Sequence, residues 1–418
     1  MIENLKDLYN GCFMEQKMLK LLSSPFYWVL LVTVVLVSLF KGLTIGVDIP
    51  IYHTAAKTLS NSYFDIYTSS RGVGGGHYTA GPLAAILWLP GAYLSEIVMR
   101  SVWAFLNVFF FLGLWLLCKR VYAKAFPKLP LSVAAQSLTL IMLVDPISMN
   151  GIQANWTSVL LLSCLGGFYL LQNQRSFLAG FLSSFAFCIK PPYGFPVLLF
   201  LLLKDRKAVM GWVLGVVCFG VFLPFLALGK MGAFAVYQDW FHTLSSVAAD
   251  PYCKYNNQSA LCVAYHLFGR QSPFVIWFVL GFAAISGGFL VWILRRFRRS
   301  DKFLGLVFVA GFFIHLTWSN LVHDHYYMAM LLPLLWINNL LVNRKLSKLG
   351  VNLWWLRFVI VHLFVMAIVG REWSIMALNF GQHLWGVLLC ILMGFDFLQG
   401  SLADSTQSDL LSARYVEA

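Results

Sequence analysis

The sequence predicts an all-α protein that crosses a membrane about a dozen times, and three observations support this fold class. Of its 418 residues, 60% are apolar and only 11% are charged. Soluble domains carry about 25% charged residues, so this chain lacks the polar surface that water would require. The apolar residues also fall in long runs, and lysine and arginine gather in short clusters between those runs, as they do beside membrane spans.

A membrane-spanning helix needs about 20 mostly apolar residues. Twelve runs approach or reach this length: 26–43, 100–118, 131–148, 156–172, 176–190, 193–204, 208–228, 272–294, 303–321, 325–342, 354–370 and 375–398. The apolar stretch 82–95 is short and contains Pro90-Gly91, so we expect a re-entrant or interfacial helix there. The runs form one predicted domain, 26–398, between an amphipathic cytosolic lead-in at 1–25 and a disordered polar tail at 399–418.

The basic clusters predict which end of the helical bundle faces the cytosol. If the N-terminus is cytosolic, five basic loops fall on the cytosolic side: 119–128, 172–175, 204–207, 295–302 and 343–348. Two long, aromatic and less basic segments, 44–99 and 229–271, then lie on the outer side. The net charge of +13 therefore suits a membrane, and no basic helix or aromatic-basic surface indicates a nucleic-acid partner.

Polar side chains recur at the outer ends of the predicted spans. Asp48 follows the first span, Asn155 follows the third, and Lys190 ends the fifth. Asn257 lies in the second long outer segment, and His323 follows the ninth span. Ionisable groups near membrane depth are costly and are often functional. Their recurrence at one level predicts a site that opens outward.

Each of these groups also has a structural interpretation. Asp48 can be a charge that flanks a helix, and the long side chain of Lys190 can extend to the interface. His323-Asp324-His325 contains metal-ligand types, but no second acidic cluster accompanies it, so we expect no obligatory metal and no cofactor. Asn155 and Asn257 each begin a glycosylation sequon, which is a motif of low specificity.

Two cysteines, Cys253 and Cys262, share the second outer segment, where a disulfide can persist. A bond between them would close a small loop around Asn257-Gln258-Ser259 and hold that motif in place. Two unpaired thiols are the alternative, because the sequence does not give the distance between them. The cysteines within apolar runs, such as Cys164, are interpreted as small buried hydrophobes.

These motifs occur in a fixed order along the chain. The order is Asp48, Tyr52, Ala55-Ala56, Tyr67, Tyr78, Pro82, Gln153-Ala154-Asn155, Lys190-Pro191, Asn257-Gln258-Ser259 and His323-Asp324-His325. Over roughly residues 40–345, this set resembles glycosyltransferase family 87, the polyprenol-phosphate-mannose-dependent α-mannosyltransferases of the GT-C fold. The sequence departs from the family pattern where Thr79-Ala80-Gly81 separates Tyr78 from Pro82, and where Ile152 separates Gly151 from Gln153.

The resemblance implies a GT-C-type helical bundle with extracytoplasmic interfacial helices and an outer active site. It also implies a sugar donor on a polyprenyl phosphate and an acid of the first outer loop as catalytic base, a role that carries over onto Asp48. A contact with the donor phosphate or sugar carries over onto His323 or His325. The departing phosphate needs cationic or hydrogen-bonding partners. The candidates for that contact are Lys190, Arg71, His77, His323 and His325, and the candidates for positioning substrate are Tyr52, Tyr78, Gln153, Asn155, Asn257, Gln258 and Ser259.

We therefore expect an inverting glycosyltransferase of the bacterial plasma membrane that moves a hexosyl group to a lipid or glycan acceptor. The resemblance implies that this group is mannosyl. A single carboxylate suffices for inversion, and Asp65 is the best rival to Asp48. The alternative function is a transporter or flippase of a lipid-linked glycan. That function predicts charged residues along a path through the spans, whereas these spans are nearly free of charge. A purely structural scaffold leaves the ordered polar motifs unexplained.

Overall fold

The computed structural model describes residues 24–61, 65–69, 78–249, 253, 257, 259–319, 322–343, 383–395 and 398–399. These residues form helices, and the β-pairing among them is one isolated antiparallel bridge between Asn257 and His323. The all-α prediction is therefore confirmed for the described part of the chain. The tail predicted at 399–418 lies outside the described residues except for Gln399, and the lead-in at 1–25 lies outside them up to residue 23.

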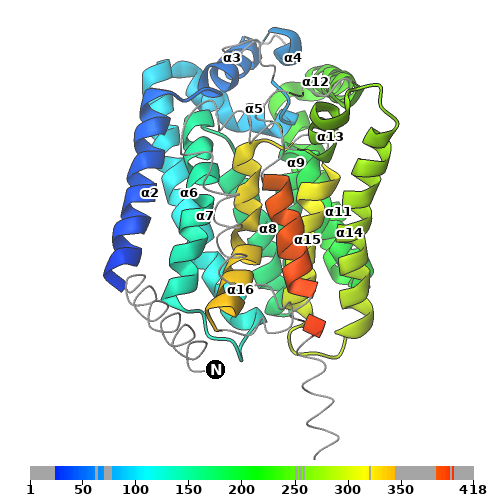
Figure 1. Cartoon of the computed structure of the whole chain (residues 1–418). Helices are drawn as coiled ribbons and strands as arrows, with labels where there is room; N and C mark the ends of the chain where they lie inside the picture. The colour runs from blue at the N-terminus through cyan, green and yellow to red at the C-terminus, as the bar shows by residue number, and fades with distance from the viewer. Residues whose placement is uncertain are drawn as a thin grey trace, which may run out of the picture.

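The helices follow one another in the bundle of Figure 1. In chain order they are α2 (Ser24–Thr44), α3 (Ile49–Ser60), α4 (Ile66–Ser69), α5 (Pro82–Trp88), η1 (Leu89–Tyr93), α6 (Glu96–Ala125), α7 (Val133–Gln153), α8 (Thr157–Gln172), α9 (Ser176–Ile189), η2 (Pro191–Gly194), α10 (Phe195–Leu202), α11 (Arg206–Val217), η3 (Cys218–Phe222), α12 (Leu223–Ala249), α13 (Ala260–Phe268), α14 (Phe274–Arg296), α15 (Phe303–Trp318), η4 (Asp324–Met330) and α16 (Leu331–Val342).

Six helices among the described residues are long and apolar enough to cross a membrane. They are Pro25–Thr44, Glu96–Ala125, Val133–Gln153, Arg206–Ser246, Phe274–Arg296 and His325–Val342. Six further apolar helices have 10–17 residues, and one of these, Pro82–Tyr93, corresponds to the stretch that we predicted not to cross. The chain is thus a polytopic membrane protein. The count of twelve spans stays a prediction, and the predicted span 354–370 lies outside the described residues.

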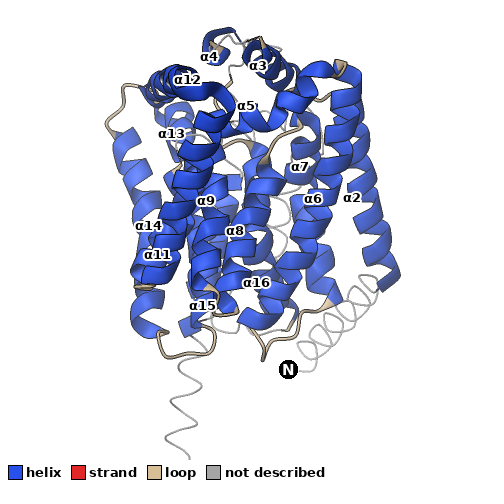
Figure 2. Ribbon diagram, turned by 180° about the vertical axis from the view of Figure 1, so that it is seen from behind, coloured by secondary structure: helices blue, strands red, loops and turns tan. Residues whose placement is uncertain are grey.

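The short helices α8, α9 and α15 lie among other helices of the bundle (Figures 1 and 2). A helix of 16 residues, such as α15, rises about 24 Å, which is less than the roughly 30 Å of a bilayer core. Gly305 to Thr317 of α15 are all buried, so this helix contacts protein over nearly its whole length. Backbone groups at its ends can therefore be satisfied by other protein segments rather than by headgroups.

One end of the bundle is covered by short helices. Figures 1 and 2 both show α3, α4, α5 and the last part of α12 at this end. The stretch 82–95 forms α5 and η1, which have seven and five residues and are too short to cross. Since successive long helices alternate in direction, the basic turns at 119–128, 172–175, 204–207 and 295–302 gather at the other end. The two ends therefore differ in charge, as the sequence predicts.

The second long segment differs from the predicted loop at 229–271. Helix α12 continues past the predicted end of the span at residue 228 and reaches Ala249, and α13 follows it. Gly229 has a φ of 68°, which interrupts the helical geometry inside α12. A positive φ is accessible to glycine at little cost, so the chain bends there. The residues after Gly229 lie across the end of the bundle instead of continuing along its axis (Figure 1).

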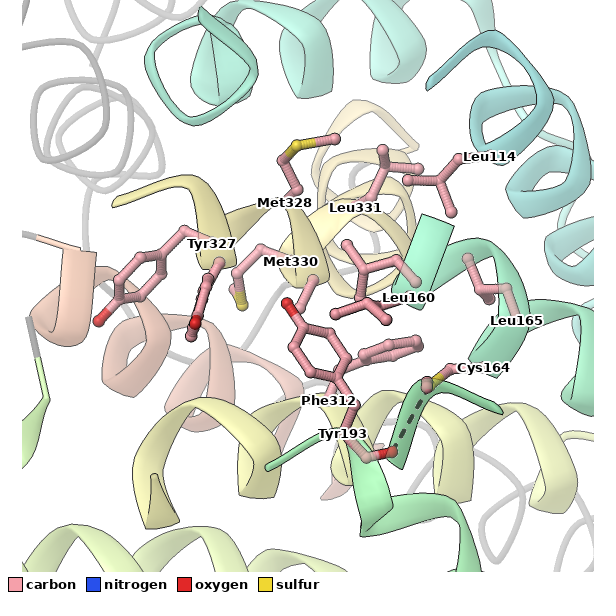
Figure 3. Close-up of a cluster of buried hydrophobic side chains, with 14 of the residues drawn as sticks. Leu114, Leu160, Cys164, Leu165, Tyr193, Phe312, Tyr327, Met328, Met330 and Leu331 are labelled. Atoms are coloured by element: carbon pink, nitrogen blue, oxygen red, sulfur yellow. Dashed lines mark hydrogen bonds between the residues drawn. The ribbon is translucent and has the colours of Figure 1, made fainter. Parts of the chain in front are cut away.

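The core beneath the covered end is built from large apolar side chains. Figure 3 shows part of it, in which Leu160, Cys164 and Leu165 of α8 lie beside Phe312 of α15. Residues of η4 and the start of α16 join the same cluster, namely Tyr327, Met328, Met330 and Leu331. The buried Cys164 thiol donates to the carbonyl of Tyr193 at 3.8 Å. This packing holds η2 and η4 against a dense apolar support.

Helices α9 and α11 approach each other closely through glycines. A Cβ atom at Gly211 would lie 1.9 Å from the carbonyl oxygen of Phe177, and one at Gly215 would lie 2.0 Å from Oγ of Ser184. Gly211 and Gly215 are four residues apart, so both lie on the face of α11 that meets α9. Small residues at this spacing let membrane helices pack backbone to backbone.

We expect Gly211→Ala to lower the free energy of unfolding in detergent by roughly 1–3 kcal/mol, because the added methyl group has no room against a backbone carbonyl. The matched control is Gly281→Ala in α14, where a Cβ would meet nothing within 4 Å. Thermal unfolding midpoints of the two variants measure the difference. Equal midpoints for both variants would contradict the close contact between α9 and α11.

Candidate active site

The candidate site begins at the connection between α2 and α3. The backbone N–H of Val47 donates to the carbonyl of Ile152 at 2.9 Å, and the N–H of Asp48 donates to the carbonyl of Gln153 at 3.1 Å. These two bonds attach the connection between α2 and α3 to the end of α7. Asp48 is therefore placed beside Asn155, although 107 positions separate the two residues in the chain.

Side chains of α6 hold the turn that follows α7. Ala154 has a left-handed φ of 51°, and its carbonyl accepts a hydrogen bond from Nε1 of Trp103 at 2.6 Å. The carbonyl of Asn155 accepts from Nδ2 of Asn107 at 3.2 Å, and Oδ1 of Asn107 accepts from Nδ2 of Asn150 at 2.8 Å. The turn thus has fixed partners for its backbone, which orients the Asn155 side chain.

A largely buried chain of polar side chains connects an acid to a cation through Asn155. Nδ2 of Asn155 donates to Oδ2 of Asp48 at 2.8 Å, and Oδ1 of Asn155 accepts from Nζ of Lys190 at 2.9 Å. Nζ of Lys190 also donates to Oη of Tyr326 at 2.9 Å. An amide has one accepting and one donating end, so this orientation of Asn155 is the one that satisfies both charged neighbours. We call Asp48, Asn155, Lys190 and Tyr326 the polar relay.

Lys190 reaches this position because α9 ends immediately before it. Pro191 follows Lys190, and a residue before proline is disfavoured in the helical conformation. Lys190 accordingly adopts an extended backbone, with φ −142° and ψ 110°. Its side chain is only 8% exposed and packs 4.9 Å above the ring centroid of Tyr326. The lysine is therefore held within the protein and does not extend to the membrane interface.

Aromatic rings enclose the Asp48 side of the polar relay. Tyr52 shares a side-chain hydrogen bond with Asp48, and its ring stacks on Trp88 with centroids 5.3 Å apart. Tyr78 meets Tyr52 edge-on at 5.9 Å and Tyr67 at 5.3 Å. Burial raises the pKa of Tyr52 well above its usual value, so its hydroxyl stays protonated and donates to the carboxylate.

The pKa of Asp48 is raised above its ordinary value. Burial is the main cause, because it disfavours the charged carboxylate. The positive charge of Lys190 and the hydrogen bonds from Asn155 and Tyr52 lower the pKa again, but only in part. A carboxylate with a raised pKa is a stronger base than one in water, and it is better matched to proton transfer near neutral pH.

Two histidines lie on the other side of the polar relay. The ring of His325 is fully buried, meets Tyr326 edge-on at 4.6 Å and stacks on His323 at 5.7 Å. Neither ring nitrogen of His325 has a hydrogen-bond partner among the described residues. A buried polar group without a partner is costly, so His325 is a candidate for contact with a bound molecule.

The structure brings several predicted site residues together and separates others. Hydrogen bonds connect Tyr52 to Asp48, Asp48 to Asn155, and Asn155 to Lys190. Tyr326 links Lys190 to His325, because its hydroxyl accepts from Lys190 and its ring contacts His325. The ring of Tyr78 contacts that of Tyr52. Gln153 contributes its backbone carbonyl, and Asn257 contacts Val322 just before the histidines. Ser259 contacts Asn257, as described below. Arg71, His77 and Gln258 lie outside the described residues.

Four interpretations from the sequence can be compared with these positions. Asp65, the rival acid, is exposed, and Glu96 pairs with Arg100 at 2.6 Å. Asn155 and Asn257 are 4% and 1% exposed, so neither side chain has room for an attached glycan. In the part of the chain that the structure describes, no three His, Cys, Asp or Glu side chains are grouped as metal ligands would be. Cys253 and Cys262 are joined by a disulfide.

Sequence reasoning missed Tyr326, Trp103 and Asn107. Tyr326 directly follows the histidine motif, and its position there was the only available signal. Asn107 interrupts an otherwise apolar run at 100–118, and an isolated amide within a span is a recognisable sign of a buried hydrogen bond.

Fold and site together define a polytopic helical membrane protein with a half-buried acid, a buried amide and a buried ammonium at one end. Residues 78–320, which are 243 of the 418, match the model of glycosyltransferase family 87, and the chain belongs to this family. It is therefore a membrane glycosyltransferase, as the sequence motifs indicate. Searches of curated proteins and of solved structures gave no match. Asp48, Tyr52 and Tyr326 lie outside the matched residues, so their roles rest on geometry.

We expect Lys190→Met to raise the pKa of Asp48 further, because it removes the positive charge that favours the carboxylate. Asn155→Ala should act in the same direction through the lost hydrogen bond. Infrared difference spectra of the protonated carboxyl band, recorded against pH, measure both changes, and Asp48→Asn identifies the band. A protonated band that disappears at lower pH in Lys190→Met than in the wild type would contradict the geometry of the relay.

Proposed function

We propose that this protein transfers a hexosyl group from a polyprenyl phosphate to a hydroxyl of a lipid or glycan acceptor. Its family suggests that the hexosyl group is mannosyl. The observation that carries the proposal is the half-buried carboxylate of Asp48, which is hydrogen-bonded through Asn155 to the Lys190 ammonium. A base and a cation that are fixed near each other suit a reaction that removes a proton and releases an anion.

The proposed transfer is a single displacement at the anomeric carbon. Asp48 accepts the proton of the acceptor hydroxyl as that oxygen forms its bond to the anomeric carbon. The bond from that carbon to the phosphate oxygen breaks on the opposite face, and the phosphate leaves with the electron pair. One carboxylate is sufficient for this route, which inverts the anomeric configuration. Asn155 and Tyr52 hold the carboxylate in place through their hydrogen bonds.

The leaving phosphate would be stabilised by Lys190 and the adjacent histidines. An ammonium group has three N–H donors, and Asn155 and Tyr326 take two of them in the described structure. The third donor and the ring of His325 are the groups that we assign to the phosphate oxygens. Donors that are fixed before the reaction stabilise developing negative charge without reorganising, so no metal ion is needed in this scheme.

The position of the site supports a lipid-linked donor and an outer active site. The polar relay lies between the ends of helices whose outer faces are apolar, which suits a donor that stays anchored in the bilayer. The basic turns lie at the opposite end of the bundle, and basic loops are typical of the cytosolic side. The disulfide between Cys253 and Cys262 is at the end that carries the site, and disulfides persist in oxidising compartments. These features favour a site on the outer face of the bacterial plasma membrane.

We expect Asp48→Asn to lower turnover by roughly 10²–10⁴-fold, because asparagine keeps the shape of the side chain but cannot accept the proton. In the wild type, activity should fall as the pH drops through the pKa of Asp48, which burial raises above its ordinary value. Initial rates of sugar transfer from a polyprenyl phosphate, measured from acidic to neutral pH, test both statements.

Two acids serve as matched controls for this variant. Asp65→Asn changes an exposed carboxylate, and Glu96→Gln changes a carboxylate that pairs with Arg100 in the first turn of α6. Both should turn over at close to the wild-type rate. Normal turnover of Asp48→Asn together with an inactive Asp65→Asn would show that Asp48 is not the base.

A further inference from the structure

The segment between α12 and α13 is closed into a ring by a disulfide. Cys253 and Cys262 are nine positions apart, and the bond joins Cys253 to the first turn of α13. Cys262 is fully buried, and Ser259 caps the same helix because its Oγ accepts from the N–H of Cys262 at 3.3 Å. The C-terminal side of the ring is therefore fixed to a helix by a covalent bond and by a cap.

Asn257 connects this ring to the histidine turn. Its side chain is 1% exposed, and its Oδ1 accepts from the N–H of Ser259 and from the N–H of Val322, each at 3.1 Å. Its backbone also forms the isolated antiparallel bridge with His323. A single amide oxygen thus joins two segments that are 65 positions apart in the chain.

The residues that follow Val322 belong to the candidate active site. The N–H of Tyr326 donates to the carbonyl of His323 at 2.8 Å, which starts the turn of η4. The hydroxyl of Tyr326 accepts from Lys190, and its ring contacts His325. A shift of Val322 and His323 would therefore move Tyr326 relative to Lys190 and move the ring of His325.

We propose that Asn257 is a positioning residue for the turn His323 to Tyr326, and that the Cys253–Cys262 disulfide keeps Asn257 in place. Binding of the phosphate-linked donor then depends on the redox state of the ring, a statement that rests on the proposed function. Reduction would convert the disulfide to two thiols while the reductant, for example a phosphine, is oxidised. The Cys253 end of the ring would then be released, and Asn257 would lose the restraint that the disulfide provides.

Hydrogen–deuterium exchange at the Val322 amide tests the structural half of this proposal without any assay of activity. In the oxidised wild type this amide donates to Asn257 and should exchange slowly. Asn257→Ala should accelerate its exchange by about tenfold or more, because a buried acceptor is lost. Asn257→Asp keeps an accepting oxygen and should stay near the wild type. Unchanged exchange in α8 would show that the fold is retained.

Reduction of the folded wild type with a phosphine gives a second, independent test that needs no substitution. It should accelerate exchange at Val322, and the double variant Cys253→Ser, Cys262→Ser should show that fast exchange with or without the phosphine. Cys218→Ser, which changes a free, half-buried thiol, is the matched control and should behave as the wild type does. If neither reduction nor Asn257→Ala changes exchange at Val322, the proposal is wrong.

Kinetics test whether this positioning matters for the donor. We expect Asn257→Ala to raise the KM for a short-chain polyprenyl phosphate sugar about tenfold, while the KM for the acceptor and the acidic limb of the pH profile stay unchanged. A general loss of structure would move all three quantities together. Faster exchange at Val322 with an unchanged donor KM would overturn the positioning role. A wild type that transfers no sugar from a polyprenyl phosphate would instead refute the proposed function, and the exchange experiment would still decide the structural claim.

Discussion

Asp48 and Lys190 carry opposite charges inside a protein whose surroundings are largely apolar, and the amide of Asn155 lies between them. A charge removed from water is stable only when it is paired and hydrogen-bonded. The relay meets this requirement with two partners for each charged group, since Tyr52 also bonds to Asp48 and Tyr326 to Lys190. The short helices and turns of the covered end bring these groups together from distant parts of the chain.

Each member of the relay is placed by a local interruption of a helix. Asp48 follows the end of α2, and Asn155 follows a left-handed residue at the end of α7. Lys190 precedes a proline that ends α9, and Tyr326 lies in the 3-10 turn η4 before α16. The helices of the bundle thus bring four irregular segments together. Irregular backbone at this depth is tolerated because protein, rather than lipid, surrounds it.

An acid and a histidine outside the relay also lie close to each other. Asp145 lies within α7 beside Pro146, and Nε2 of His383 is 3.7 Å from its Oδ2. His383 also contacts the ring of Tyr327, whose neighbour in the chain belongs to the relay. The acid within α7 thus has a polar side chain close by, in a bundle whose predicted spans are nearly free of charge.

Hydrophobic run length and basic loops predicted the helical class, the long helices α2, α6, α7 and α14, and the non-crossing stretch at 82–95. They did not predict the bend at Gly229, because an apolar run can continue through a change of direction. Polar residues at the span ends indicated Asp48, Asn155 and Lys190. Their hydrogen bonds could not be predicted, because contacts between residues more than 100 positions apart depend on how the helices pack. Tyr326 was missed because its hydroxyl gains its role only from the lysine opposite.

Donor choice is the most direct measurement of the central claim, that the relay activates an acceptor against a lipid-linked sugar phosphate. Purified protein in lipid vesicles would receive radiolabelled mannose either as a polyprenyl phosphate or as a nucleotide sugar, with a membrane lipid extract as acceptor. The account predicts labelled product from the polyprenyl phosphate alone, with an anomeric configuration opposite to that of the donor. Labelled product from the nucleotide sugar, or a retained configuration, would contradict it.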